Sequence, residues 1–166
     1  LQTWQNIELI ITDDGSTDLT TQVCAEWIEK NKSFFSSTKL ITVPKNTGIP
    51  SNSNRGLRAS TGEWIKMLSG DDRLLKTCIA DNLEYALQFS DTHFITSDLS
   101  QIDENGILIR DKVINEGVAF FAKLPTARKQ LKNYSRWPVF LNTPAFFYKR
   151  DILRILGNSD EEFKIY

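Results

Sequence analysis

The chain has 166 residues, of which 40% are hydrophobic and 25% charged, values typical of one soluble globular domain. Its 20 Lys and Arg nearly balance 21 Asp and Glu, so the net charge of -1 argues against a protein held on nucleic acid by its overall field. No apolar run approaches the roughly 20 residues that cross a bilayer, and no signal-peptide pattern opens the chain. We therefore expect a cytoplasmic protein without a nucleic-acid partner, and we make no prediction of its oligomeric state.

Cysteine and histidine are scarce. Cys24 and Cys78 cannot build a disulfide scaffold, and each lies in an apolar helical pattern, so we expect two buried, reduced thiols. The single histidine, His93, stands at the start of a predicted strand and is interpreted as a structural residue rather than a catalytic base.

The first third of the chain predicts a strand, a helix and a second strand. A β-branched run at residues 7–12 has the length of a buried strand. Leu19, Val23 and Trp27 then recur every four positions, with Cys24 and Ile28 beside them, and predict the buried face of a helix. A second strand is expected at residues 39–43, closed by a proline.

Helices and strands continue to alternate up to about residue 90. We expect a polar helix over residues 51–60 and a third strand over 63–68. A long helix should start near Leu74, with its apolar side chains at Leu75, Ile79, Leu83 and Leu87.

The second half is less regular. Strands are predicted at residues 93–97, 107–110 and 145–148, with one basic helix from about Phe120 to Asn133. A last helix at 152–156 should end at Gly157. Alternation of strands and helices predicts an α/β fold with a mostly parallel sheet flanked by helices.

Three polar loops follow the first three predicted strands. In open parallel sheets, ligands bind outside the carboxyl ends of the strands, so these loops should meet at one ligand-binding edge. They are Asp13-Asp14-Gly15-Ser16, Asn46-Thr47-Gly48 and Ser69-Gly70-Asp71-Asp72.

Each acidic pair has two interpretations. Asp71 and Asp72 suit a hard divalent cation that also contacts substrate phosphates, or one of them caps the following helix. Asp13 and Asp14 could accept hydrogen bonds from a nucleobase or ribose, or cap the helix that follows them. The presence of two such pairs at one predicted edge favours ligand binding.

These residues also carry a family resemblance. The segment from Trp4 to Asp18 resembles the opening region of the family 2 glycosyltransferases of GT-A fold, as do Asn46-Thr47-Gly48, Asn54 and Gly56. Gly62-Glu63-Trp64 leading into Leu68-Ser69-Gly70-Asp71-Asp72 is similar to the metal-binding segment of that family. The resemblance covers the first half of the chain and is looser at residues 142–145 and 157–161.

The resemblance implies one glycosyltransferase domain over residues 1–166. Residues 1–90 would bind a nucleoside diphosphate sugar, and residues 91–166 would face a saccharide or lipid-linked acceptor. Mn²⁺ or Mg²⁺ on Asp71 and Asp72 would assist departure of the nucleoside diphosphate. The expected donor-binding residues are Asp13, Asp14, Gly15, Ser16, Asn46, Gly48, Asn54 and Asp71.

The family resemblance further implies an inverting, hexosyltransferase-type reaction in polysaccharide assembly. It implies a location in the cytoplasm or, through peripheral association, at the inner face of the membrane. The catalytic base is unknown, because the carboxylate that serves the family would lie beyond Tyr166. The family's first strand and helix would precede Leu1, so we expect an excerpt that is inactive alone and poorly folded without a strand in the central slot of its sheet.

Two departures from the family pattern favour an alternative, a sugar-nucleotide-binding module without catalysis. Ser69 stands where the family has the first Asp of its metal motif, and Ser53 where many members have an Arg. An aspartyl-phosphate phosphatase is disfavoured, because it needs two Asp residues spaced two positions apart. Here Thr12 lies two positions before Asp14, and Gly15 lies two positions after Asp13. On the basic helix, Arg128, Lys129 and Lys132 indicate either a solvated face or contact with an anionic acceptor, and Trp137 either core packing or acceptor stacking.

Overall fold

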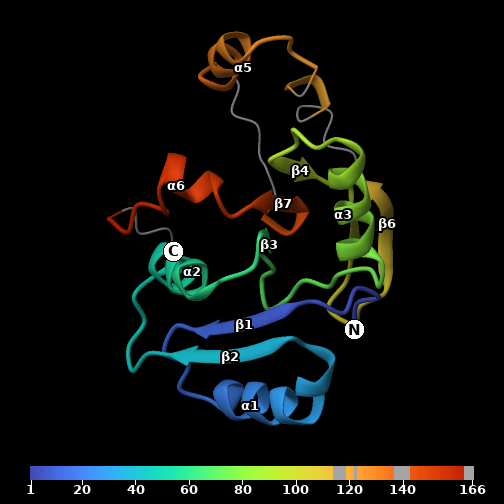
Figure 1. Cartoon of the computed structure of the whole chain (residues 1–166). Coiled ribbons are helices and arrows are strands. Elements are labelled where there is room, and N and C mark those ends of the chain that lie inside the picture. The colour runs from blue at the N-terminus through green and yellow to red at the C-terminus, as the bar shows by residue number, and fades with distance from the viewer. Residues whose placement is uncertain (114–118, 122, 137–142, 163–166) are drawn as a thin grey trace. The chain divides into compact units, whose positions relative to one another are not determined.

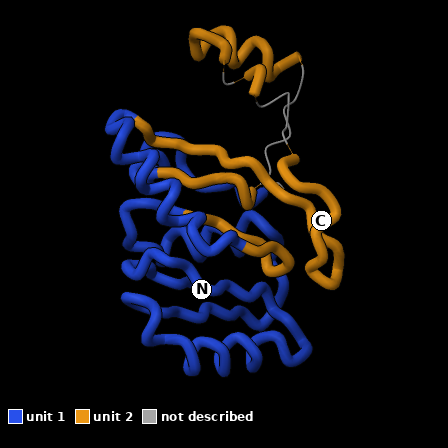
Figure 2. Tube along the Cα trace, turned by 90° about the vertical axis from the view of Figure 1, so that its right-hand side faces the viewer, with its two compact units in different colours: residues 1–65, 74–91, 149–166 blue, residues 66–73, 92–148 orange. Residues whose placement is uncertain are grey.

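The structure is a computed structural model that describes residues 1–113, 119–121, 123–136 and 143–162. Trp137 and Asn142 lie outside these ranges. Figure 1 labels the helices and strands of the chain. The chain forms two compact units (Figure 2), and both are built from separate stretches of sequence. The first unit comprises residues 1–65, 74–91 and 149–166, and the second comprises residues 66–73 and 92–148. The α/β fold class is confirmed, with helices and strands alternating through the first half.

A strand–helix–strand element opens the first unit. Strand β1 (Glu8–Asp13) pairs in parallel with β2 (Ser37–Thr42), and Asp13 lies opposite Thr42 at the carboxyl ends. Because parallel neighbours need a crossover connection, helix α1 (Thr20–Asn31) and the 3₁₀ turn Lys32–Phe34 join them. Among the described residues, β1 pairs with β2 alone in its sheet. That a further strand fills its other edge stays a prediction.

Helix α1 buries only part of the face that was predicted. Leu19, Val23 and Trp27 are 68%, 60% and 42% exposed, so the expectation that they form its buried face is wrong. Cys24 and Ile28, which lie beside them on the predicted face, are half-buried. The apolar spacing located the helix correctly, but among the described residues Trp27 is covered only in part, with its ring 6.0 Å from that of Phe35.

Helix α2 (Ile49–Ala59) lies against β1. It begins directly after Gly48, two residues earlier than predicted, with Pro50 in its first turn. Asn52 donates through Nδ2 to the carbonyl of Thr12 at 3.3 Å, and a Cβ on Gly56 would lie 3.3 Å from Thr12 Cγ2. Figure 1 shows β1 and β2 between α1 and α2, so the carboxyl end of β1 meets the start of α2.

Strand β3 (Trp64–Lys66) is shorter than predicted, and α3 (Cys78–Gln88) starts four residues later than expected. The amino-terminal segment contacts the start of α3: the Gln2 side chain donates to the carbonyl of Leu75 at 2.9 Å and accepts from the amide of Ile79 at 3.1 Å. Leu75 and Leu87 are exposed, whereas Asn82 and Ala86 are buried. Both cysteines are free but only half-buried, so their expected full burial is wrong.

The second unit contains antiparallel strands. β4 (Phe94–Thr96) pairs with β7 (Phe146–Lys149), which follows the 3₁₀ turn Thr143–Ala145. Phe147 is only 2% exposed, and the rings of Phe94 and Phe146 lie 5.1 Å apart. β5 (Leu99–Ile102) and β6 (Leu108–Val113) form a hairpin that the sequence had indicated only in part. Strands β1 and β2 thus pair in parallel, whereas β4 with β7 and β5 with β6 pair in antiparallel fashion.

Two shorter helices complete the described chain. The single helix predicted from Phe120 to Asn133 is wrong in extent, because a turn at residues 123–126 separates a short helical stretch from α5 (Ala127–Tyr134). Thr126 caps α5, and its hydroxyl accepts from the amide of Lys129. Helix α6 (Ile152–Leu156) ends at Gly157, whose φ is 79°. Among the described helices, none has the length and apolar character needed to span a membrane.

Candidate functional site

The carboxylate of Asp13 holds the loop after β1 in place through hydrogen bonds. Asp13 is 7% exposed, and its Oδ2 accepts from the amides of Gly15 at 3.1 Å and Ser16 at 3.0 Å. Hydrogen bonds from the Ser16 side chain and from the Ser16 and Gly15 amides outweigh the effect of burial and lower the pKa of Asp13. The loop therefore keeps a negative charge at the end of β1.

Gly15 allows this loop to touch the loop that follows β2. Its φ of 84° lies in the left-handed region that favours glycine. A Cβ added to Gly15 would lie 2.8 Å from both the amide nitrogen of Asn46 and the carbonyl carbon of Lys45. The predicted convergence of the Asp13–Ser16 and Asn46–Gly48 loops is therefore present in the first unit.

Asp14 joins the two loops through both carboxylate oxygens. Oδ2 accepts from the amides of Thr47 at 3.0 Å and Gly48 at 2.8 Å, and Oδ1 accepts from the Thr47 hydroxyl at 2.7 Å. Arg55 on α2 adds a short ion pair to Oδ1, with both side chains mostly buried. Desolvation raises the pKa of Asp14, but the bonds from Thr47, Arg55 and Gly48 outweigh it and hold the pKa below its usual range.

Arg55 is held between α2 and the second loop. Its guanidinium also donates to the Thr47 hydroxyl at 2.8 Å and to Asn52 Oδ1 at 3.1 Å. Its Nε is buried without a partner in the described part of the chain. Ser53 lacks the cation that many family members carry, and Arg55 supplies one two residues later. Spacing alone did not reveal this pair, because Arg55 lies 41 residues from Asp14.

Within the described residues, Asn54 does not share the side-chain hydrogen-bond partners of Asp14; its own lie after α6. It is 1% exposed, and its amide donates to the carbonyl of Ser159 at 2.7 Å and to Glu161 at 2.8 Å. Asn54 Oδ1 accepts from the amide of Ser159 at 3.0 Å. This expected donor-binding residue therefore fastens the segment after α6 to α2.

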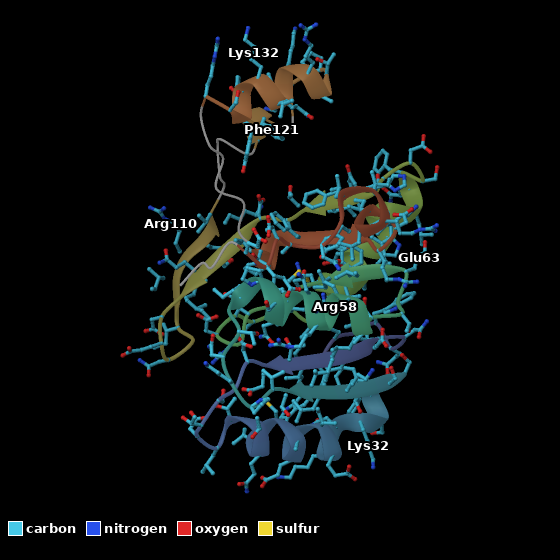
Figure 3. All side chains as sticks on the ribbon, turned by 90° about the vertical axis from the view of Figure 1, so that its left-hand side faces the viewer. Lys32, Arg58, Glu63, Arg110, Phe121 and Lys132 are labelled. Atoms are coloured by element: carbon cyan, nitrogen blue, oxygen red, sulfur yellow. The ribbon has the colours of Figure 1, made fainter. Side chains whose placement is uncertain are left out.

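Glu161 is a residue that sequence reasoning did not single out. Besides Asn54, its carboxylate accepts from the Ser51 hydroxyl at 3.0 Å and from Arg58 at 3.0 Å. The hydrogen bonds from Asn54, Arg58 and Ser51 lower the pKa of Glu161 to about 2. Helix α2 thus holds Asp14 through Arg55 and Glu161 through Ser51, Asn54 and Arg58, the last of which is labelled in Figure 3.

Asp71 and Asp72 belong to the second unit. They follow β3 in a tight turn, in which the Asp72 amide donates to the Ser69 carbonyl at 3.2 Å. Asp71 is exposed and Asp72 half-buried. The alternative that Asp72 caps the next helix is wrong, because α3 begins only at Cys78 and its N-cap residue is Thr77.

The Asp71–Asp72 turn fits a cation that substrate phosphates help to hold. No group of three His, Cys, Asp or Glu side chains that could hold a metal occurs in the described ranges. Mg²⁺-type sites often use one or two carboxylates together with phosphates, and this turn offers two exposed or half-exposed carboxylates. His93 lies exposed just before β4.

Comparison with known proteins identifies the family. The model of glycosyl transferase family 2 matches residues 1–156. The chain belongs to this family. An uncharacterized glycosyltransferase of Haemophilus influenzae is 37% identical over 87 residues, which are 52% of this chain and 33% of that protein. One of Nostoc sp. is 30% identical over 158 residues, covering 92% of this chain and 44% of the relative.

Solved structures support the same fold. The crystal structure of residues 1–349 of S. aureus TarS, in complex with UDP, matches with a TM-score of 0.71 and 18% identity. The match covers 98% of this chain and 44% of the TarS chain. The α/β architecture is therefore that of a GT-A glycosyltransferase. The chain spans less than half the length of each of these three proteins.

Proposed function

We propose that the protein carrying this chain transfers a sugar from a nucleoside diphosphate sugar to a saccharide or lipid-linked acceptor. The match of the family 2 model to residues 1–156 carries this proposal. The joined loops after β1 and β2 support it, because they form a polar edge at the carboxyl ends of parallel strands.

In this proposal, the nucleotide lies against the two loops that Asp14 joins. Both Asp14 oxygens already accept hydrogen bonds from Thr47, Gly48 or Arg55, so this carboxylate shapes the loops more than it offers a vacant acceptor. The exposed side chains of Ser16 and Asn46 are then candidates for direct contact with the donor. The UDP bound to TarS supports a uridine nucleotide as the first ligand to test.

Asp71 and Asp72 are the proposed holders of Mn²⁺ or Mg²⁺. When bound there, such an ion would supply positive charge that stabilises the departing diphosphate. The acceptor hydroxyl would attack C1 of the donor sugar with inversion, as a carboxylate base takes its proton. We expect that base beyond Tyr166, and we place the reaction in polysaccharide assembly on the cytoplasmic side.

The second candidate is a sugar-nucleotide-binding module without transfer. Ser69 favours this candidate. It stands where the family pattern has a further Asp, so the turn carries two carboxylates, those of Asp71 and Asp72. Both candidates require donor binding, and only transfer requires an acceptor.

Titration of the full-length protein with UDP, in the presence and absence of Mn²⁺, tests donor binding. We expect heat of binding that depends on Mn²⁺. Release of UDP from UDP-sugars is then measured with and without saccharide acceptors. Acceptor-dependent release supports transfer, and binding without release supports the module. Absence of binding to UDP and, in the same titration, to GDP, ADP, CDP and dTDP contradicts both.

A further inference from the structure

Charge is unevenly distributed along this nearly neutral chain. Residues 117–148 contain five Lys or Arg and no Asp or Glu, whereas the remaining residues have a net charge of -6. Concentration of one charge sign in a single stretch points to an anionic partner more strongly than the overall charge does.

Residues 119–121 and 123–136 of this stretch will be called the α5 cap. Its five cationic side chains are all exposed, and none pairs with a carboxylate in the described ranges. They are Lys123, Arg128, Lys129, Lys132 and Arg136. The mutual repulsion of these charges is therefore not relieved within the described structure.

The α5 cap has its own local order. The Thr126 hydroxyl fixes the start of α5, and the rings of Phe121 and Tyr134 lie 6.3 Å apart, which packs the preceding turn against the helix. Gln130 Nε2 reaches back to the carbonyl of Leu124 at 3.4 Å. The cations are consequently displayed on a formed surface, from which Lys132 extends outward in Figure 3.

Helical geometry places the cations of α5 on one side. At 3.6 residues per turn, Arg128, Lys132 and Lys129 fall within an arc of about 100°. Leu131 and Tyr134 occupy the adjoining arc. The helix is therefore amphipathic, with a cationic face beside an apolar one.

Apolar side chains of the α5 cap are exposed as well. Leu131 is 70% exposed, Phe120 58% and Tyr134 49%. A soluble polyanion is recognised by charge and needs no apolar side chains beside the cations. An anionic bilayer offers phosphate headgroups next to hydrocarbon and complements both faces at once.

We infer that the α5 cap docks on an anionic lipid bilayer. Lys and Arg side chains contact the headgroups, while Phe120 and Leu131 enter the boundary between headgroups and acyl chains. This inference extends the acceptor side of the proposed function, because lipid-linked acceptors lie at such a surface. Vesicle binding can nevertheless be measured without donor or acceptor.

Sedimentation of the full-length protein with vesicles tests the inference. We expect binding to phosphatidylcholine vesicles that contain phosphatidylglycerol and little binding to phosphatidylcholine alone. Replacing Lys129 and Lys132 by Gln should weaken binding about fivefold per cation removed. In the matched control, Gln replaces Lys30 and Lys39, two exposed lysines of the first unit. This control variant should bind the vesicles as the parent protein does.

A second variant separates insertion from charge. Leu131→Ser keeps every cation and changes a side chain that is 70% exposed, so folding is expected to persist, as checked by circular dichroism. It should weaken the vesicle binding that remains at high salt, where charge attraction is screened. Equal binding by the Lys129/Lys132 variant, equal binding to both vesicle types, or binding to soluble polyphosphate but not to vesicles would overturn the inference.

Discussion

The chain presents two Asp-Asp pairs that look alike in sequence and differ in structure. In the described part of the chain, Asp13 accepts hydrogen bonds from Gly15 and Ser16, and Asp14 accepts four from Thr47, Gly48 and Arg55. Within the described residues, no protein donor contacts the carboxylates of Asp71 and Asp72. Both pairs follow a strand, so the position after a strand does not determine the role of a carboxylate.

The two pairs differ in how many carboxylate lone pairs remain free of hydrogen bonds from the protein. A carboxylate has about four lone-pair sites, and Asp14 accepts four bonds from Thr47, Gly48 and Arg55. Asp71 is exposed, and within the described residues its carboxylate accepts no hydrogen bond from the protein. The first pair should therefore act mainly on loop structure and stability, and the second mainly on ligand binding.

The largest expected effect is on metal-dependent binding. Asp71→Asn removes charge from the exposed turn and should abolish Mn²⁺-dependent UDP binding, while stability is preserved. Ser69→Ala, two residues away, should have little effect. Calorimetric titration of both variants checks this, and parent-like metal dependence in the Asp71 variant would refute the metal assignment.

Asp14→Ala should produce the largest loss of stability. It removes the partner of Arg55, whose side chain is 16% exposed, and leaves a mostly buried cation unpaired. We expect the free energy of unfolding to fall by about 3 kcal/mol, measured by urea denaturation. Asp71→Ala is the matched control and should leave the urea midpoint nearly unchanged; equal losses in both variants would remove the distinction between the two pairs.

Gly15→Ala tests the close approach of the two loops. A methyl group there would meet the backbone of Lys45 and Asn46 at 2.8 Å, in a residue with φ of 84°. We expect a loss of about 2 kcal/mol in thermal or urea unfolding. Gly70→Ala offers a contrast in the second acidic loop, because a Cβ there would meet nothing within 4 Å. Tolerance of Ala at residue 15 would show that the loops separate at little cost.

Glu161 should make the stability of the folded protein sensitive to acid. Its pKa is about 2 in the folded protein and ordinarily 4.5, so the unfolded chain binds the proton more readily. The carboxylate therefore contributes its full stabilisation above about pH 4.5 and loses it as the pH falls toward 2. Glu161→Gln should flatten the dependence of the melting temperature on pH in this window. Glu162→Gln, at the exposed neighbouring residue, should retain it.

The local sequence predicted the positions of strands, helices and loops better than it predicted which distant residues contact one another. The β-branched run at residues 7–12 and the polar loops after β1 and β2 lie where they were expected, because strand length and turn residues are local properties. The ion pair of Arg55 with Asp14 depends on packing of α2 over β1. Glu161 contacts α2 across 107 residues of sequence from Asn54, and no periodic pattern encodes such a contact.

Exposure was the property that periodicity predicted least well. Leu19, Val23 and Trp27 have the spacing of a buried helix face, yet they are exposed, because burial requires a covering segment as well as an apolar stripe. The interruption before α5 follows from Pro125 and the Thr126 cap, which together favour a helix start at Ala127. The direct donor contacts and the metal ligands stay predictions.

Asp72→Asn should have the smallest effect on stability. If Asp72 capped a helix, its loss would cost about 1 kcal/mol. Because α3 starts at Cys78, six residues later, the side chain is too far along the chain to cap it, and the expected change is within about 0.5 kcal/mol. Mn²⁺-dependent UDP binding should nevertheless weaken, though less than in Asp71→Asn, since one carboxylate of the turn remains. Loss of stability without loss of binding would instead indicate that Asp72 supports the turn and that Asp71 alone faces the cation.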